Sequence, residues 1–505
     1  MSRLDLLLVN APSRTSVYGP LSDLAAIEPP VWAGLIARHC LNRGFSVEIL
    51  DAEAEGLSVD QTAWRIAEKN PRLAAFCIYG HQPSASTQCL PAAGKVADVL
   101  RTHLQGNSLA PIQTLALGTH PSALPKRTLR EEPFDYVCQG EGPATIAALL
   151  SQSFGIPEPG GVLSIPGLWG NALPPWGTMG NITDLDNDLP GQAWGLLDMT
   201  RYRAHNWHLW GRSGHQRSGY ASVQTSLGCV FRCEFCCIQA PFGDVAPRMR
   251  YWSPENVADQ IDELGNLHDI WNIKIPDEMF VLNRQHVREI CERLIKKNIG
   301  QHLNMWAYAR VDTVKDEEML ALMRRAGFRW LGIGIESASK HVRDGVEKGR
   351  FGNEEIIAAV RRVQTAGICV GANYIFGLPD DTRESCAETL ALACELNTEY
   401  ANFYCAMAYP GSPLHAQVSK TNPSALPENN PCGWLGYSQH AYESMPLPTD
   451  ALTYQEVIDI RDGAFMRYFT RPKYLDMMQG KFGDGVVEQI ERMTALGEPR
   501  RQHRK

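Results

Sequence analysis

Ser226-Leu-Gly-Cys-Val-Phe-Arg-Cys-Glu-Phe-Cys-Cys237 is the stretch from which the fold and the chemistry of this chain are best inferred. Its Cys229, Cys233 and Cys236 have CxxxCxxC spacing and follow a strand-like run at 220–227. Three thiolates in one short loop are soft anionic ligands that can bind one metal centre together. Structural zinc sites usually have four ligands, so the trio favours a 4Fe-4S cluster with one iron left open. Zinc binding, or packing of small apolar residues, is the alternative.

The composition restricts the class of protein. A chain of 505 residues is long enough for about three domains, and 44% apolar with 21% charged residues is typical of a globular protein. The net charge of -8 argues against a nucleic-acid partner. No apolar run is long enough for a membrane span, and residues 1–10 read as a strand rather than a signal peptide. The 14 cysteines lack paired spacing, which favours a cytoplasmic setting.

Residues 4–152 alternate strand and helix signals at the spacing of an α/β domain. Short parallel strands with intervening helices form a doubly wound sheet, whose ligand site lies at the carboxyl ends of the strands. No GxGxxG motif follows the first strand, so the dinucleotide fingerprint is missing. The expected strands are 4–9, 46–50, 73–78, 111–117 and 135–138.

The rest of the chain predicts a linker, a partial barrel and a helical end. Residues 153–219 are rich in Gly, Pro and Asn, as expected between domains. Residues 220–415 contain six strand–helix units, with the cysteine loop at the end of the first strand, where such barrels place their active sites. Residues 416–505 are expected to be mainly helical. The expected barrel strands are 221–227, 272–275, 303–307, 330–335, 369–376 and 401–407.

The cysteine loop, with Phe235 before the last cysteine, resembles the cluster loop of the radical S-adenosylmethionine (radical SAM) superfamily. The first third resembles the cobalamin-binding domain of cobalamin-dependent radical SAM enzymes, because Gly-x-His-Pro and Gly-Glu-Gly occur at 118–121 and 140–142. A Rossmann-like domain with another ligand, or none, is the alternative for that third. The resemblance implies an α/β protein with a Rossmann-like cobalamin-binding domain at 1–152, an interdomain segment at 153–219, a partial (β/α)6 radical SAM barrel at 220–415 and a helical cap at 416–505.

Loops at the carboxyl ends of the first sheet carry the residues that the resemblance places at cobalamin. Related proteins use a DxHxxG motif whose histidine coordinates cobalt, whereas residues 51–56 have Glu53 at the histidine position. No imidazole ligand is therefore expected from this loop. Glycines let loop backbone lie flat against a corrin ring. The predicted cobalamin-binding residues are Asp51, Glu53, Gly56, Gly80, His81, Gly118, Thr119, His120, Gly140, Glu141 and Gly142.

Strand ends of the barrel align, by the same resemblance, with contacts to S-adenosyl-L-methionine. Asp277 and Glu278 end the second strand, where a carboxylate or backbone acceptor suits the ammonium group, and Arg310 has a bidentate fork shaped for the carboxylate. Glu336 ends the fourth strand, where an acceptor meets ribose hydroxyls or the amine. The predicted S-adenosylmethionine-binding residues are Asp277, Glu278, Arg310, Glu336, Ser337 and Gly377.

The stretch from Tyr202 to Trp210 holds two His and two Trp within nine residues. Such density is unusual for a linker. It predicts either a packing belt or a wall of the substrate pocket. In the second case His205 and His208 are the candidate contacts to a polar or anionic substrate.

The resemblance implies a cobalamin-dependent radical SAM methyltransferase. After formation of a 5′-deoxyadenosyl radical, methylcobalamin would deliver a methyl group to an unactivated carbon, or to a phosphinate phosphorus, of a small metabolite. The implied cofactors are a 4Fe-4S cluster, S-adenosyl-L-methionine and cobalamin, and the implied partners are a small-molecule substrate and an electron donor such as flavodoxin or ferredoxin. One alternative is a cobalamin-containing radical SAM enzyme that rearranges or cyclises its substrate without methylation. The other is a noncatalytic, metal-stabilised binding module.

Overall fold

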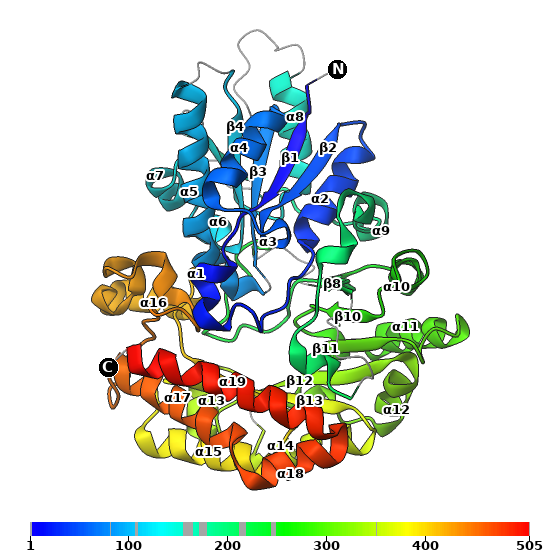
Figure 1. Cartoon of the computed structure of the whole chain (residues 1–505), viewed down its shortest axis with the longest axis vertical. Coiled ribbons are helices and arrows are strands. Elements are labelled where there is room, and N and C mark those ends of the chain that lie inside the picture. The colour runs from blue at the N-terminus through cyan, green and yellow to red at the C-terminus, as the bar shows by residue number, and fades with distance from the viewer. Residues whose placement is uncertain are drawn as a thin grey trace.

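The structure is a computed structural model that describes residues 3–80, 82–106, 110–154, 165–170, 179–211, 219–243, 249–349 and 351–503. Two six-stranded sheets form its framework. The N-terminal sheet occupies the upper half of Figure 1 and the second sheet the lower half. One continuous cluster of buried apolar side chains, from Leu6 to Ile490, runs through both halves.

The N-terminal sheet has the strand order β2-β1-β3-β4-β5-β6. Its first five strands pair in parallel, and helices α2 (Val31–Leu41), α4 (Val59–Lys69), α5 (Ser86–Gly106) and α8 (Pro143–Phe154) lie around them. Every residue of β3 is buried, as expected for a strand covered on both faces. The strands are β1 (Leu6–Asn10), β2 (Val47–Asp51), β3 (Leu73–Ile78), β4 (Gln113–Gly118), β5 (Tyr136–Cys138) and β6 (Leu168–Gly170).

The predicted strands of this sheet agree with the structure within two residues at each end, and β3 agrees in full. The short strand β6 was not predicted. It pairs antiparallel with β5, although it lies in the range expected to be a linker. Three residues beside glycines and prolines carry no periodic signal, so the sequence could not reveal it.

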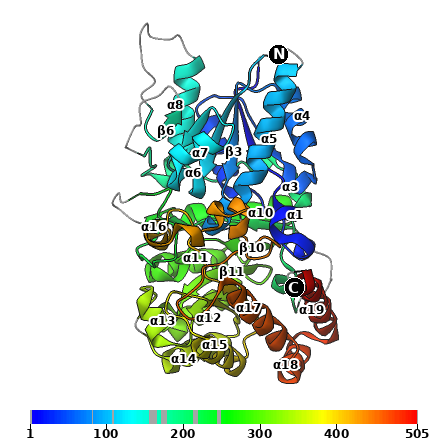
Figure 2. The same ribbon diagram turned by 90° about the vertical axis from the view of Figure 1, so that its left-hand side faces the viewer.

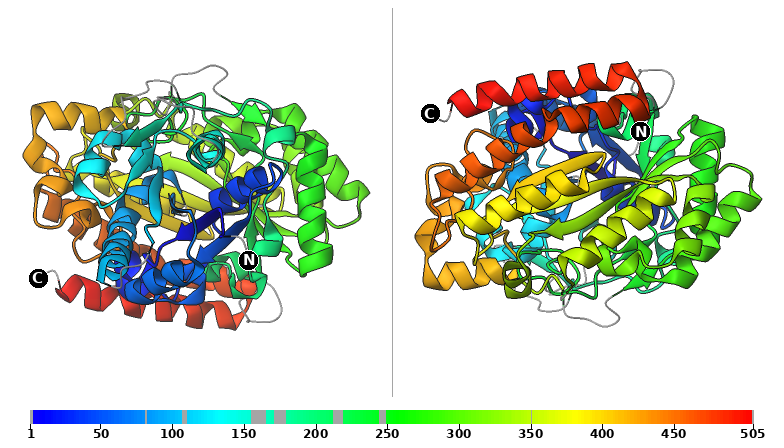
Figure 3. Two further views of the ribbon diagram at one scale, coloured as in Figure 1. Left: turned by 90° about the horizontal axis from the view of Figure 1, so that it is seen from above. Right: turned by 90° about the horizontal axis from the view of Figure 1, so that it is seen from below.

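The second sheet has the order β14-β13-β12-β11-β10-β7, and all of its strands are parallel. The helices that follow its strands lie around it in the right-hand panel of Figure 3, which shows the molecule from below. They are α10 (Pro254–His268), α11 (Arg284–Lys296), α12 (Glu317–Ala326), α14 (Asn353–Thr365) and α15 (Arg383–Leu396). The strands are β7 (Tyr220–Ser222), β10 (Asn272–Ile275), β11 (Asn304–Arg310), β12 (Phe328–Glu336), β13 (Cys369–Phe376) and β14 (Tyr400–Cys405).

The first barrel strand differs from its prediction. Residues 221–227 were expected to form one strand, but β7 ends at Ser222 and β8 (Ser226–Leu227) pairs antiparallel with β9 (Arg250–Tyr251). The side chain of Asp277 accepts hydrogen bonds from Thr225 and Ser226, which draws the chain out of the sheet. This break directs the cysteine loop toward the space between the two sheets.

The C-terminal part of the chain is mainly helical, as predicted. Helices α17 (Tyr454–Phe469), α18 (Pro472–Phe482) and α19 (Asp484–His503) lie along the barrel, with α17 against β14. Helix α16 (Pro413–Thr421) instead lies at the level where the two halves meet (Figure 2). In the described part of the chain, no helix is both long and apolar enough to cross a membrane.

Candidate functional site

A cavity lies between the carboxyl ends of the two sheets and is lined by residues of both. Parallel strands in both domains therefore end at one common space, which is where α/β folds place their ligands. The side formed by Cys229, Cys233, Cys236, Glu278, Glu336 and Lys348 is called the barrel wall, and the side formed by Asn10, Glu53, Gly80 and Thr119 is called the N-terminal wall.

The cysteine loop follows β8 and faces the cavity with three free thiols. Gln239 Nε2 donates to the Cys229 carbonyl at 2.7 Å, and the Arg310 guanidinium lies 3.9 Å from the centre of the Phe231 ring, so the loop is held from two sides. Among the described residues, no three His, Cys, Asp or Glu side chains are close enough to hold a metal ion as they stand. Three soft thiols opening on one cavity fit an iron–sulfur cluster once their side chains turn toward a common point.

Burial makes the thiols of Cys229 and Cys236 hard to ionise on their own. It raises the pKa of Cys229 to about 11, a shift that Arg310 opposes, and it raises the pKa of Cys236 well above its usual value. A bound metal removes this penalty because its positive charge stabilises the thiolate. The loop is therefore suited to ligating a metal rather than to acting as an exposed nucleophile.

Asp277 supports the cysteine loop rather than opening freely onto the cavity. Its carboxylate accepts hydrogen bonds from the Thr225 amide at 2.8 Å, the Thr225 hydroxyl at 2.6 Å and the Ser226 hydroxyl at 2.6 Å. Burial raises the pKa of Asp277 to about 6, and these donors oppose that shift. The side chain expected at the ammonium of S-adenosylmethionine is thus occupied in fixing the residues before Cys229.

Glu278 is the carboxylate of the barrel wall that remains open to the cavity. Among the described residues, the structure assigns no hydrogen-bond donor to it. Burial raises the pKa of Glu278 to about 7, while Lys274 and Lys348 oppose the shift. Its negative charge also raises the pKa values of Cys229 and Cys236, so it lies close to the cysteine loop. A cationic group in the cavity would therefore meet an uncommitted acceptor here.

Arg310 and Glu336 both line the cavity, but each is already paired. Arg310 Nε donates to Asp312 at 3.1 Å, and its Nη2 donates to the Lys348 carbonyl. Glu336 ends β12 with φ +67°, a conformation uncommon outside glycine, and forms an ion pair of 2.5 Å with the Lys348 ammonium. Lys348 was not predicted from the sequence. It lies in a loop away from the strand ends and reaches the barrel wall only through the tertiary fold.

Ser337 and Gly377 are placed away from the cavity lining. Ser337 is fully buried, and its hydroxyl lies 3.2 Å from Thr389 Oγ1 on α15. Gly377 has φ +81°, and an added Cβ would lie 2.7 Å from Val457 Cγ1 on α17, so this turn needs a glycine for packing. Their positions do not support the predicted contacts with S-adenosylmethionine, since both face the helices outside the sheet.

The carboxylates that follow β2 are used within the N-terminal domain. Asp51 accepts hydrogen bonds from Asn10 Nδ2 at 2.8 Å and from the Tyr202 hydroxyl at 2.9 Å. Glu53 reaches the cavity, yet its Oε1 accepts from the amides of Ser13 and Arg14. Glu53 therefore holds the loop that follows β1. Gly56, with φ +67°, ends the short helix α3 (Ala52–Glu55) outside the cavity lining.

The N-terminal wall is partly bare backbone. Gly80 lines the cavity with φ +67°, and an added Cβ would lie 2.6 Å from Ala85 Cβ. Gly118, with φ +145°, would place a Cβ 2.0 Å from the Ile78 carbonyl oxygen, so only glycine fits before Thr119, which lines the cavity. Such a side-chain-free edge fits a large flat ligand such as a corrin ring.

Four further residues predicted at cobalamin lie outside the cavity lining, namely His120, Gly140, Glu141 and Gly142. Glu141, between Gly140 and Gly142, is fully buried, pairs with Arg250 and accepts from the Ile182 amide at 3.0 Å, so it joins the two domains. His120 is also buried, with its Nδ1 3.2 Å from Thr87 Oγ1. His81 lies outside the described residues.

Neither His205 nor His208 lines the cavity, and His208 lies at the amino end of the barrel. The Ala26 amide donates to His205 Nδ1 at 3.2 Å, and His208 Nε2 lies 2.9 Å from the carbonyl oxygen of Asn304, the first residue of β11. Between them, Trp207 fills the amino end of the barrel. Its ring centre lies between 5.1 and 5.4 Å from those of Trp306, Trp330 and Tyr400. The substrate-wall prediction is corrected by this placement: the stretch is the packing belt, because its rings fill the apolar end of the barrel.

Two family models and several curated relatives match the chain. The model of the radical SAM superfamily matches residues 223–393, and that of the B12 binding domain matches residues 21–150. An uncharacterised methyltransferase of Pyrococcus horikoshii is 25% identical over 482 residues, which cover 94% of each chain. An anaerobic magnesium-protoporphyrin IX monomethyl ester cyclase of Rubrivivax gelatinosus is 25% identical over 474 residues, which cover 90% of this chain and 76% of the relative.

A solved structure shares the fold of both domains. It is that of the radical S-adenosylmethionine methyltransferase TsrM from Kitasatospora setae with cobalamin and a 4Fe-4S cluster bound. It superposes with a TM-score of 0.61 at 19% identity and covers 83% of this chain and 75% of that chain. Residues matched by the two family models line opposite walls of one cavity, and the cysteine loop lies within the radical SAM match. The chain therefore contains a radical SAM domain and a B12-binding domain, which line one cavity together.

Proposed function

We propose that this protein is a methyltransferase that acts on an unactivated carbon, or a phosphinate phosphorus, of a small molecule. When bound, the cluster, S-adenosylmethionine and cobalamin supply the radical and the methyl group, and the protein orients and shields them. The shared cavity supports cobalamin-dependent radical chemistry, because the cysteine loop and residues of the B12-binding domain line the same space. The methyltransferase relative, matched over 94% of each chain, supports methyl transfer. We assign the functional units to residues 1–152, 153–219, 220–415 and 416–505.

The barrel wall would hold the cluster and S-adenosylmethionine. Cys229, Cys233 and Cys236 are the proposed cluster ligands. Glu278 is the proposed acceptor for the ammonium group, since its carboxylate faces the cavity without an assigned donor among the described residues. Lys348 is the proposed cation for the carboxylate, because its ammonium has three N–H donors and can bind a second acceptor beside Glu336. The Arg310 guanidinium already donates to Asp312 and to a backbone carbonyl.

The N-terminal wall would hold cobalamin mainly through backbone. Gly80 and Thr119 present loop atoms to the cavity, and Glu53 fixes the neighbouring loop by accepting from the Ser13 and Arg14 amides. Because the Glu53 carboxylate is occupied in this way, it is not proposed as a ligand of cobalt. The loop 51–56 accordingly stabilises the wall and leaves cobalt without a histidine from this position.

The floor of the cavity is proposed as the place where the substrate is recognised. Lys274, on β10, forms a buried ion pair of 3.1 Å with Glu28 of the N-terminal domain, and the Ser222 hydroxyl donates to the same carboxylate at 3.0 Å. Glu28 and Ser222 line the cavity, as do Tyr308 on β11 and Tyr404 on β14. A buried pair is costly to desolvate, and a polar group of the substrate that joins its hydrogen bonds would offset part of that cost.

A second candidate function is cyclisation without methyl transfer. The supporting observation is the cyclase of Rubrivivax gelatinosus, which matches 90% of this chain at the same 25% identity as the methyltransferase relative. Both reactions use the same shared cavity, so the geometry alone favours neither. The full-length match to the methyltransferase relative, 94% of each chain, places methyl transfer first.

The product decides between the two candidates. The reconstituted enzyme is incubated anaerobically with a metabolite extract, a reductant and S-adenosylmethionine carrying a deuterated methyl group, and the products are analysed by mass spectrometry. A product that gains the labelled methyl supports the proposal. A product that loses hydrogen and gains no label supports cyclisation and contradicts methyl transfer. Failure of the wild type to bind iron and cleave S-adenosylmethionine would instead favour a noncatalytic binding module.

The proposed electron donor and cellular location follow from the iron–sulfur cluster. The cluster needs one-electron reduction, so we propose a small electron carrier such as flavodoxin or ferredoxin as the partner. Free thiols at all 14 cysteines are consistent with a reducing cytoplasm. Stimulation of S-adenosylmethionine cleavage by purified flavodoxin, compared with a chemical reductant, tests the partner.

A further inference from the structure

The segment after α16 connects the barrel to the N-terminal domain. Residues 427–440, called the C-terminal strap, contain the 3₁₀ turns Pro427–Asn429 and Gly433–Tyr437 and lie against α5. At one end, the Gln439 side chain pairs with the Cys405 backbone on the edge of β14, accepting from its amide at 2.9 Å and donating to its carbonyl at 2.8 Å. The Ser438 hydroxyl donates to the Val17 carbonyl of the N-terminal domain.

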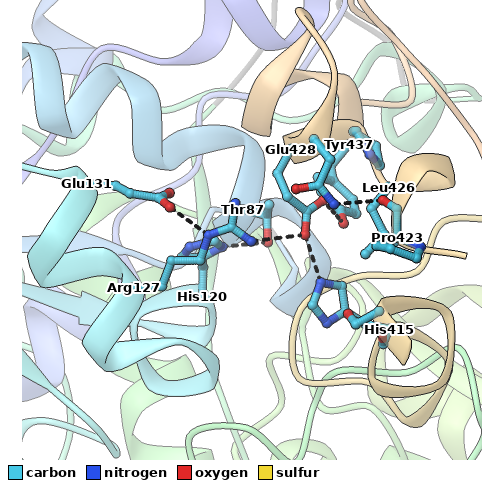
Figure 4. A network of polar contacts seen from close by, with 12 residues as sticks. Thr87, His120, Arg127, Glu131, His415, Pro423, Leu426, Glu428 and Tyr437 are labelled. Carbon is cyan, nitrogen blue, oxygen red and sulfur yellow. Dashed lines mark hydrogen bonds and ion pairs between the residues drawn. The ribbon is translucent and has the colours of Figure 1, made fainter. Parts of the chain in front are cut away.

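At the other end of the strap, Glu428 is a buried hub, and its side chain is 1% exposed. It accepts from the Tyr437 hydroxyl at 2.6 Å, lies 3.0 Å from His415 Nε2, and lies 3.4 Å from Arg127 Nη1 on α7 (Pro125–Glu131) of the N-terminal domain. Figure 4 shows these groups converging on the carboxylate. Burial opposes ionisation of Glu428, but the bonds from His415 and Tyr437 outweigh it and lower its pKa. The strap thus presents a charged acceptor to the N-terminal domain.

Trp434 makes the second contact of the strap with the same domain. The Arg127 guanidinium lies 4.5 Å from the centre of its ring, and the His120 ring meets it edge-on, with ring centres 4.5 Å apart and planes at 79°. Cation–π and edge-on aromatic contacts of this kind each stabilise a buried pair. Glu428 and Trp434 of the strap therefore contact Arg127 and His120 of the N-terminal domain.

His120, which Trp434 contacts, adjoins the N-terminal wall. His120 directly follows Thr119, which lines the cavity, and Gly118, whose backbone lies against Ile78. From the α5 side the same segment is held by Ser86, whose hydroxyl accepts from the His120 amide at 2.9 Å. The segment 118–121 consists of Gly118 and the first residues of helix α6 (Thr119–Ala123). It thus lies between α5 and the strap, and a shift of Trp434 or Arg127 would move its backbone at the cavity.

We propose that Glu428 and Trp434 are positioning residues for cobalamin: through Arg127 and His120, they set the position of the segment 118–121, at the start of α6, on the N-terminal wall. The inference rests on the proposed function in that cobalamin is taken as the ligand of this wall. It makes the C-terminal strap part of the cofactor site rather than only a cover over the barrel. Neither residue lines the cavity, so both act through the groups they hold.

The test measures hydroxocobalamin binding by the full chain, by equilibrium dialysis and by the absorption spectrum of the bound cofactor. Glu428→Gln and Trp434→Ala are expected to weaken binding about tenfold and to shift the spectrum, as for other groups that hold a cofactor-contacting residue. Glu131→Gln is the matched control, since Glu131 accepts from the same Arg127 at 2.7 Å within α7 but does not belong to the strap. Trp434→Phe keeps an aromatic ring and should retain most of the affinity.

Iron content after reconstitution and the melting temperature are measured on the same variants. Weaker cobalamin binding with unchanged iron content in Glu428→Gln, and not in Glu131→Gln, supports the inference. A lower melting temperature with unchanged cobalamin affinity and spectrum contradicts it, because the strap would then only stabilise the fold. If the wild type binds no cobalamin, the proposed function fails together with this inference. Equal affinity of wild type and both strap variants contradicts the inference alone.

Discussion

The two walls of the cavity are built on different physical principles. The barrel wall carries charged side chains that face the cavity. Glu278 is open to the cavity, and among the described residues the one salt bridge of Lys348 is with Glu336. On the N-terminal wall, the Glu53 carboxylate accepts hydrogen bonds from backbone amides, and Gly80 presents backbone without a side chain to the cavity. The barrel wall is therefore suited to recognising a charged ligand, and the N-terminal wall is suited to recognising the shape of a ligand. A charged, flexible ligand and a large, flat one call for these two solutions.

The largest effect is expected from the cysteine loop, where recognition depends on covalent ligation. Cys233→Ala should abolish cluster binding and cleavage of S-adenosylmethionine, because two thiolates cannot replace three. Cys237→Ala is the matched control, since this neighbour is a buried free thiol outside the CxxxCxxC set. Iron and sulfide content and 5′-deoxyadenosine formation are the measurements. Cleavage by Cys233→Ala, or its loss in Cys237→Ala alone, would contradict the assignment of the cluster ligands.

The next effect tests whether charge governs the barrel wall. Glu278→Gln should weaken S-adenosylmethionine binding about tenfold to a hundredfold, as for loss of a charge-assisted hydrogen bond of about 1.5–3 kcal/mol. Burial raises the pKa of Glu278 to about 7, so wild-type affinity should rise as the pH increases through 7 and the carboxylate ionises. Calorimetric titrations between pH 6 and 8 should show this rise in the wild type and a flat profile in Glu278→Gln. A parallel rise in both would show that another group titrates.

A smaller effect tests whether the N-terminal wall acts through backbone. Glu53→Gln should weaken cobalamin binding about fivefold, since a neutral acceptor loses about 1 kcal/mol of its bonds to the Ser13 and Arg14 amides. S-adenosylmethionine affinity should not change. Electron paramagnetic resonance of the cobalt(II) form should show no nitrogen splitting from a histidine in the wild type. Such splitting would overturn the account of this wall.

The smallest effect concerns the packing belt at the amino end of the barrel. His205→Ala should change the affinity for S-adenosylmethionine and for cobalamin by less than about twofold, because the side chain lies away from both walls and surface or peripheral changes are usually within about 0.5 kcal/mol. A modest fall in melting temperature is expected from the lost stacking on Trp207. A large loss of substrate turnover without a fall in melting temperature would restore His205 as a substrate contact.

The fold was largely predictable because its signals are local. Strands such as β3 are short apolar runs bounded by polar turns, and they were placed within a few residues. The division between β7 and β8 was not predictable, since it depends on Asp277, which is distant in sequence from the Thr225 and Ser226 that it binds. The antiparallel strand β6 was missed for the opposite reason, because three residues are too few to show a period.

The candidate site was only partly predictable. Glu278 and Glu336 follow strands that could be recognised, so their approach to one cavity follows from the topology of a parallel sheet. Lys348 and Glu28 could not be found, because each is brought to the cavity by a loop packed against another element. Ser337 and Gly377 were misplaced, since a strand end fixes the position of the backbone but not the side on which a buried side chain lies.

The sequence by itself determined the chemistry of this protein, because three thiols at fixed spacing in one loop restrict the metal whatever surrounds them. It also determined the order of the two domains through their local periodicity. Only the tertiary structure decided which charges are free. The Asp277 and Glu53 carboxylates are consumed by nearby amides, whereas Glu278 remains open to the cavity. The physical reason is that burial and hydrogen-bond pairing arise between segments distant in sequence, and these two quantities govern whether a charge can meet a ligand.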